Sequence, residues 1–102
     1  MDLKPGSRWR SAVCGAEVVI VRPPKTAARL ECGGMAMAAA AAERGAPRPL
    51  DPAHAGGVLL GKRYEDGESG LEALCAKPGA GSLSVDGRPM AVKDAKKLPA
   101  SD

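Results

Sequence analysis

Three cysteines and one histidine are the residues of this 102-residue chain whose types could do soft-metal or redox chemistry. They are Cys14, Cys32, Cys75 and His54. Thiolates and imidazoles bind zinc and iron, and two neighbouring thiols can form a disulfide. By count the four residues make a Cys₃His zinc set, although their spacing matches no usual zinc knuckle. The other interpretations are a thiol-redox pair at Cys14 and Cys32 or inert cysteines that fill core, the latter favoured for Cys75.

Cys14 and Cys32 flank the strongest strand signal in the chain. Residues 17–21 read EVVIV, and such β-branched runs favour a strand. The prolines at 23 and 24 end that strand, because proline cannot donate to a sheet. Residues 30–32 then predict a short return strand, and Gly33 with Gly34 predicts a tight turn.

The middle of the chain has a different composition. Residues 35–45 read MAMAAAAAERG, and this alanine content favours a short helix that ends at Gly45. Residues 46–57 hold three prolines and close on paired glycines, which is typical of a linker. We therefore expect a first β module at 1–37, a loosely packed linker at 38–57, a second β module at 58–92 and a charged tail at 93–102, all in one compact unit.

The second module carries its own strand and turn signals. Strands are expected at 58–64, 71–74 and 82–85. The dipeptide Asp86-Gly87 is a strong hairpin-turn signal.

An internal repeat relates the two modules. When the second module is aligned on the first, Trp9 aligns with Tyr64. In the same register Cys14 aligns with Ser69, and each of these two residues is followed by a glycine. After a two-residue deletion in the second module the match resumes, and Met37 meets Met90. The alternative is a chance match in a chain rich in Gly, Ala and Pro. Modules of about 30 residues cannot support separate cores, so we expect a mostly β fold in which the two pack as a pseudo-dimer.

The expected core is small, because much of the apolar share of 44% is alanine, which buries little area. The chain has one Trp, one Tyr and no Phe. We expect the core to contain the larger apolar residues of the two modules: Trp9, Tyr64, Val18, Val19, Val21, Leu30, Leu74, Leu83 and Met90.

Each module resembles the desulforedoxin-like module, a small rubredoxin-type iron domain. The resemblance rests on an aromatic residue, a Cys-x-x-Cys-Gly turn, a valine-rich strand and a closing Leu-x-Cys-Cys-Gly-x-x-Met. In the first module these appear as Trp9, SAVCG at 11–15 and LECGGMAM at 30–37. In the second they appear as Tyr64, DGESG at 66–70 and LSVDGRPM at 83–90.

The resemblance implies four ligand positions in each module. Those of the first are Ser11, Cys14, Cys32 and Gly33, so two thiolates remain, and those of the second are Asp66, Ser69, Val85 and Asp86. It implies that the Cys14 and Cys32 sulfurs are neighbours, because thiolates on one zinc lie roughly 3.7 Å apart. It also implies that Asp66 and Asp86 converge, although two turn aspartates are the simpler interpretation. We expect no bound metal or cofactor, with zinc or iron as the alternative.

A set of basic residues marks the first module. Strand alternation would place Arg8 and Arg10 on one face and Trp9 on the other. An anion-binding face and an ordinary solvated face are both consistent with this set. Nucleic acid is disfavoured as a partner, because there are no further aromatic residues for base stacking and the net charge is only +3. The basic residues are Arg8, Arg10, Arg22, Lys25 and Arg29.

The sequence favours a non-enzymatic, metal-free interaction or accessory module whose partner is another protein. The chief alternative is residual thiol-redox or zinc or iron binding at Cys14 and Cys32, and the third is weak anion or nucleic-acid binding. We expect a cytoplasmic location without a membrane contact. Residues 1–10 lack the apolar core of a secretion signal, and the VVIV run at 18–21 is too short to span a bilayer.

Overall fold

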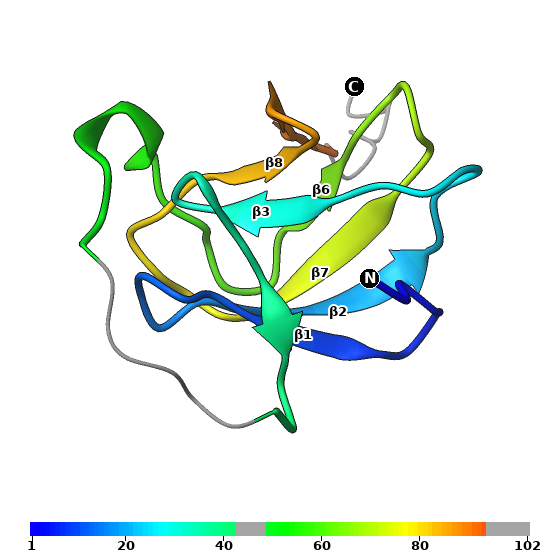
Figure 1. Ribbon diagram of the computed structural model, residues 1–102, viewed down its shortest axis with the longest axis horizontal. Coiled ribbons are helices and arrows are strands. Elements are labelled where there is room, and N and C mark those ends of the chain that lie inside the picture. Colours follow the sequence, from blue (N-terminus) through cyan, green and yellow to red (C-terminus); the bar gives the residue numbers. More distant parts are fainter. Residues whose placement is uncertain (43–48, 94–102) are drawn as a thin grey trace, which may run out of the picture.

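The computed structural model describes residues 1–42 and 49–93, and these form two antiparallel sheets, which confirms the predicted mostly β class (Figure 1). The strands of the first half are β1 (Arg8–Arg10), β2 (Glu17–Arg22), β3 (Leu30–Cys32), β4 (Met35–Ala36) and β5 (Ala38–Ala39). One 3₁₀ helix, η1 (Pro52–His54), precedes the strands of the second half, which are β6 (Arg63–Glu65), β7 (Glu72–Lys77), β8 (Leu83–Val85), β9 (Arg88–Pro89) and β10 (Ala91–Val92).

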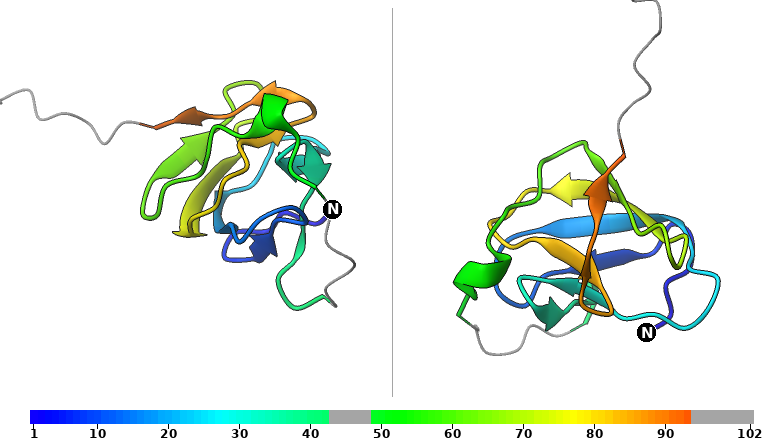
Figure 2. Two further views of the ribbon diagram at one scale, coloured as in Figure 1. Left: turned by 90° about the vertical axis from the view of Figure 1, so that its left-hand side faces the viewer. Right: turned by 90° about the horizontal axis from the view of Figure 1, so that it is seen from above.

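Both sheets combine strands from the two halves of the chain. The larger has the order β10-β6-β7-β2-β1-β5, and the smaller has the order β4-β3-β8-β9. The halves therefore join along two seams, β2 against β7 and β3 against β8. In Figure 2 the blue and cyan strands of the first half lie beside the yellow and orange strands of the second.

The strands of the first half recur in the second at constant intervals along the chain. β6 and β7 follow β1 and β2 at one interval, and β8, β9 and β10 follow β3, β4 and β5 at a slightly shorter one. The pairing is centred on equivalent residues, since Val19 pairs with Leu74 in one seam and Glu31 pairs with Ser84 in the other. When each strand is replaced by its equivalent in the other half, the strand order of each sheet reads the same from either end.

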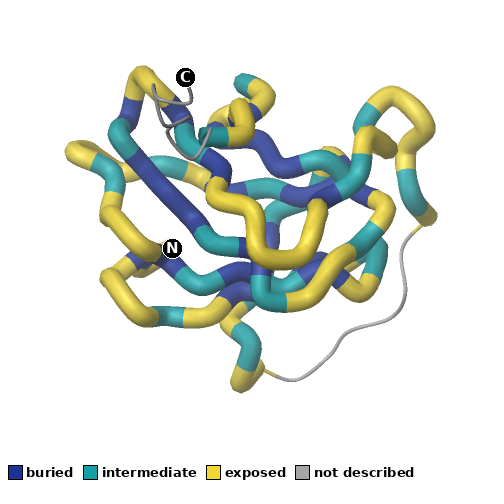
Figure 3. Tube along the Cα trace, turned by 180° about the vertical axis from the view of Figure 1, so that it is seen from behind, coloured by how far each residue is buried: buried dark blue, intermediate teal, exposed yellow. Residues whose placement is uncertain are grey.

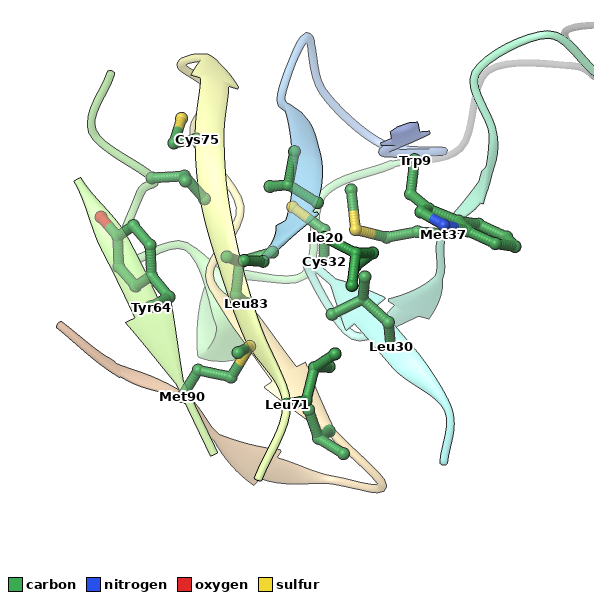
Figure 4. Close-up of a cluster of buried hydrophobic side chains, with 14 of the residues drawn as sticks. Trp9, Ile20, Leu30, Cys32, Met37, Tyr64, Leu71, Cys75, Leu83 and Met90 are labelled. Carbon is green, nitrogen blue, oxygen red and sulfur yellow. The ribbon is translucent and has the colours of Figure 1, made fainter. Parts of the chain in front are cut away.

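The core lies between the two sheets, and exposed residues are concentrated in the turns (Figure 3). Figure 4 shows Trp9 beside Met37 at one side of this core, with Tyr64 and Met90 at the other. Six of the nine predicted core residues are buried, namely Trp9, Val18, Leu30, Tyr64, Leu83 and Met90. The core also contains residues that are not among these nine: Leu3, Ile20, Met37, Val58, Leu71 and Val85.

The prediction of Val21 as a core residue is wrong, and Val19 and Leu74 are only half-buried. Successive side chains of a strand point to opposite faces of the sheet. Val18 and Ile20 face the smaller sheet and are enclosed, so Val19 and Val21 point outward. Val21 is consequently 40% exposed. An all-apolar run gave no sign of which alternate residues face inward.

The predicted alanine-rich helix is also wrong where the structure describes it. Residues 35–36 and 38–39 form β4 and β5, which pair with β3 and β1. An isolated helix of this length is marginal in water, so strand pairing outweighs the propensity of alanine. Residues 43–45 of the predicted helix lie outside the described residues. No helix within 1–42 or 49–93 has the length and apolar character needed to cross a bilayer.

The end of the expected linker is hydrogen-bonded to the second half, so it is not loosely packed. The Ser82 N–H donates to the His54 carbonyl at 2.8 Å, and the Ser82 hydroxyl accepts from Gly56 N–H at 2.6 Å. Of the strand predicted at 58–64, residues 63–64 lie in β6 and Val58 forms a bridge with Gly79, but residues 59–62 between them form an exposed turn. In contrast, β7 continues to residue 77, beyond the short strand predicted at 71–74.

Ile20→Ala should lower the free energy of unfolding by about 2–5 kcal/mol, because Ile20 is 1% exposed and the substitution leaves a cavity between the sheets. Val21→Ala, one residue along the same strand, should change it by about 0.5 kcal/mol or less. Urea unfolding of both variants measures the difference. Equal losses would contradict the assignment of the inward face.

Candidate functional site

Two of the three cysteines meet at the edge of the core. Cys14 lies in the loop between β1 and β2, and Cys32 is the last residue of β3. Their Sγ atoms are 3.8 Å apart, so the two sulfurs are neighbours as expected. This separation is van der Waals contact between thiols, short enough that a modest movement would bring them into bonding range.

The hydroxyl of Ser11 is fixed beside both sulfurs. Its Oγ accepts hydrogen bonds from the N–H groups of Val13 at 3.0 Å and Cys14 at 3.2 Å. A serine hydroxyl has two acceptor positions and one proton. Both acceptor positions are therefore occupied, and the hydroxyl proton remains free to donate to a neighbouring sulfur.

Backbone from the second half covers the thiols of the first. Gly81 donates its N–H to Cys14 Sγ at 3.5 Å. A Cβ on Gly81 would lie 3.1 Å from Cys32 Sγ, and one on Gly79 would lie 2.6 Å from Cys14 Sγ and 2.7 Å from the Ala16 nitrogen. Only glycine allows the backbone to approach this closely. The loop after β7 is thus part of the site.

The two thiols have different acidities. Burial raises the pKa of Cys14, but hydrogen bonds from Ser11, from the Ala16 and Gly81 backbone and with Cys32 together hold it below its ordinary value. Burial raises the pKa of Cys32 to about 12, against the opposing hydrogen bond from Ser11. Cys14 is only partly buried, whereas Cys32 is fully buried. Cys14 is therefore the more acidic and the more accessible of the two thiols.

Cys75 is a core residue, as the sequence favoured. It is 1% exposed, and its Sγ donates to the Lys77 carbonyl at 3.1 Å. Burial raises the pKa of its thiol. These features describe an unreactive side chain.

His54 lies against the turn that follows Cys32, but it does not complete a metal site. A Cβ on Gly34 would lie 2.9 Å from His54 Cδ2, so the imidazole packs on the backbone of that turn. Within the described part of the chain, no group of three or more His, Cys, Asp or Glu side chains is arranged to hold a metal ion. The described residues therefore do not assemble the Cys₃His set.

The four residues that the resemblance places at ligand positions in the first half do not supply the four donors of a tetrahedral metal site. The oxygen of Ser11 already accepts two N–H groups, and Gly33 has no side chain. Two thiolates remain, whereas a structural zinc or rubredoxin-type iron takes four donors.

The two aspartates at the corresponding positions of the second half are each bonded to another residue of the chain. Asp66 Oδ2 accepts the Ser69 N–H at 3.0 Å and lies 2.8 Å from the Arg88 guanidinium. The Arg88 hydrogen bond, against the opposing effect of burial, holds the pKa of Asp66 well below its usual range. Asp86 instead accepts the Arg29 N–H at 2.9 Å. Each aspartate thus has its own partner within the chain.

Three of the five basic residues of the first half are engaged within the protein. Arg8 pairs with Glu17 at 3.2 Å, and Arg29 pairs with Glu31 at 3.2 Å. Arg10 donates to the Ala40 carbonyl at 2.6 Å. Arg8 is exposed and Trp9 buried, in line with the predicted alternation. The remaining two, Arg22 and Lys25, are exposed.

Sequence reasoning missed the cover of the thiols and the ion pair of the second half. Gly79 follows Pro78 directly, and Gly81 comes two residues later. Alternating glycines after a strand are a signal of close backbone approach. Nothing in the local sequence marked Arg88 as the partner of Asp66, because 22 residues separate them.

Comparison of the chain with models of known protein families, with curated proteins and with solved structures finds no match.

Arg88→Met should lower the free energy of unfolding at pH 7 by about 1.5–3 kcal/mol, because it leaves the Asp66 carboxylate, 5% exposed, without its cation. Since the pKa of Asp66 is lowered by folding, its contribution is complete above the unfolded value near 3.9 and is lost as the pH falls toward the folded pKa. The variant should therefore lose less stability on acidification than the wild type.

The control is Arg63→Met, which removes an exposed guanidinium whose partner, Glu72, keeps Lys93 at 3.0 Å. It should cost about 1 kcal/mol or less. Urea titrations from pH 7 to pH 2 test both variants. Identical acid profiles for Arg88→Met and the wild type would contradict the role of this pair.

Proposed function

We propose that the chain is a small accessory protein whose Cys14 and Cys32 act as a reversible dithiol–disulfide pair. The observation that carries the proposal is the 3.8 Å separation of the two sulfurs. Oxidation would remove one proton and one electron from each thiol and join the sulfurs at about 2.05 Å. In the reducing cytosol, where we place the protein, such a pair stays reduced until it meets an oxidised partner.

The asymmetry of the two thiols supports a redox role over two inert core cysteines. An inert pair would be enclosed and protonated throughout, as Cys75 is. Cys14 is instead partly exposed, and the Gly81 N–H donates to its sulfur. Reactive cysteines in proteins are typically accessible thiols whose thiolate is stabilised in this way.

The pair also has a proposed evolutionary origin. Under this proposal the two halves descend from copies of a desulforedoxin-like module that pack as an intrachain pseudo-dimer and no longer bind a metal. The recurrence of the strands at constant intervals supports this origin, as does the centring of the β2–β7 pairing on Val19 and Leu74. Cys14 and Cys32 would then be two surviving ligands, which accounts for their contact. The module would exchange reducing equivalents with another protein and catalyse no reaction of its own.

Mild oxidation with diamide should give one intramolecular disulfide, between Cys14 and Cys32, located by peptide mapping without prior reduction. Because the two residues are 18 apart, closure of this loop should stabilise the protein by roughly 3 kcal/mol in urea unfolding. Cys75→Ser, which removes the buried third thiol, should oxidise in the same way. A disulfide that includes Cys75, or none at all, would exclude the redox pair.

Ser11→Cys should create a third thiolate beside Cys14 and Cys32, since Ser11 stands at a ligand position of the resembled module and its side chain is bonded to the Cys14 N–H. Three protein ligands with water in the fourth position are enough for a tetrahedral ion. Addition of Co²⁺ should then give a thiolate charge-transfer band. Ser84→Cys, which replaces a buried serine bonded to Glu31, is the control and should not. Equal spectra for the two variants would argue against the proposed origin.

A further inference from the structure

The two sulfurs differ in access from outside. Cys32 is the 0% exposed end of β3, between Met35 of β4 and Leu83 of β8 in the smaller sheet. Cys14 is partly exposed at the surface loop between β1 and β2. Exchange with a disulfide requires the attacking sulfur to approach the substrate sulfur directly. Unless the smaller sheet unfolds, an external disulfide can reach only Cys14 of the two cysteines.

From this difference in access we infer that Cys14 exchanges with an external disulfide and that Cys32 then resolves the mixed disulfide. In the same inference, the Ser11 hydroxyl positions and stabilises the reacting sulfur. The inference rests on the proposed function, because it requires that the two cysteines can form a disulfide. It adds the class of substrate and the order in which the sulfurs react.

The surroundings of Cys14 suit a substrate of this class. On one side the sulfur is closed off by the backbone of Gly79 and Gly81, where an added Cβ on Gly79 would lie 2.6 Å from it. The adjacent Gly15 has only the Pro78 carbonyl within 4 Å of its Cβ position. A disulfide in a peptide or in a small thiol compound would therefore approach Cys14 from the exposed side at Gly15, and not through the glycine cover.

Ser11 is placed to act on either sulfur. Both acceptor positions of its oxygen are held by the N–H groups of Val13 and Cys14, so the oxygen is fixed in the Cys14 turn and its proton is free to donate. While Cys14 is a thiolate, the hydroxyl can donate to it. Once Cys14 is in a mixed disulfide, the same hydroxyl can donate to Cys32 as that thiol loses its proton.

The steps balance without another reactant. Cys14 gives up its proton and its thiolate attacks one sulfur of the substrate. The Cys14–substrate disulfide forms as the substrate S–S bond breaks, and the second substrate sulfur leaves as a thiolate that takes up a proton. Cys32 then attacks Cys14 Sγ, the Cys14–Cys32 bond forms, and the first substrate sulfur leaves as a thiol that takes up the Cys32 proton. Two protein thiols are oxidised, and one substrate disulfide is reduced to two thiols.

The aromatic disulfide 5,5′-dithiobis(2-nitrobenzoate) is a direct probe, because each exchange releases a coloured thiolate. Folded wild-type protein should release two equivalents in two steps and finish with a Cys14–Cys32 disulfide. Samples quenched in acid after the first step should carry the adduct on Cys14, as located by mass spectrometry. Because this measurement uses the unaltered chain, it does not depend on how any variant folds.

Variants separate the two thiols. Cys32→Ser should release one equivalent and retain the adduct on Cys14, and Cys14→Ser should react about 100-fold more slowly than the wild type. An early wild-type adduct on Cys32 or Cys75, or a fast Cys14→Ser variant, would overturn the order. If the wild-type protein stopped at a stable Cys14 adduct and formed no disulfide, Cys14 would still be the first thiol to react. Resolution by Cys32 and the proposed redox pair would both be refuted.

Ser11 is tested by the pH dependence of the first step. Ser11→Ala should shift the midpoint of its rate to higher pH, and Ser11→Thr, which keeps the hydroxyl, should restore the wild-type midpoint. Ser84→Ala removes a buried hydroxyl that is bonded to Glu31, and it should leave the midpoint unchanged. A Ser11→Ala midpoint equal to that of the wild type would show that Ser11 serves only the local turn.

Discussion

The pairing of the two halves along β2–β7 and β3–β8 is the constraint on which the rest of the structure depends. Neither half holds a complete core, since Trp9 and Met37 come from one half and Tyr64 and Met90 from the other. A β module of about 30 residues buries too little surface to be stable alone. The thiol site has the same dependence, because Cys14 and Cys32 belong to the first half and their glycine cover, at 79–81, belongs to the second.

The two halves use one local turn for different chemistry. Ser11 Oγ accepts the Cys14 N–H, and Asp66 Oδ2 accepts the Ser69 N–H, each three residues further on. In the first half the turn brings a thiol against the buried Cys32. In the second half it brings a carboxylate against Arg88, and an ion pair ties the turn to β9. One half therefore offers a reactive pair, and the other a fixed polar contact.

Several parts of the fold could be predicted because they depend on local sequence. The paired turns at Gly33-Gly34 and Asp86-Gly87 have positive φ at all four residues, as such hairpin signals predict. The contact of Cys14 with Cys32 followed from the resemblance to a metal module. The remainder depended on tertiary structure: β5 formed from alanines because β1 offered a partner, and Val21 was left outside by the inward-facing positions of β2. The Arg88–Asp66 pair and the cover by Gly79 and Gly81 required the assembled fold.

Cysteine labelling during urea unfolding tests the dependence of the site on the seams most directly. Cys32 and Cys75 lie in different halves and are both buried, while Trp9 reports on the first half by its fluorescence. If the seams hold the protein together as one unit, both thiols should become reactive in a single transition that coincides with the change in Trp9 fluorescence. Exposure of Cys32 at lower urea than Cys75 would mean that the halves unfold separately, and it would contradict the account.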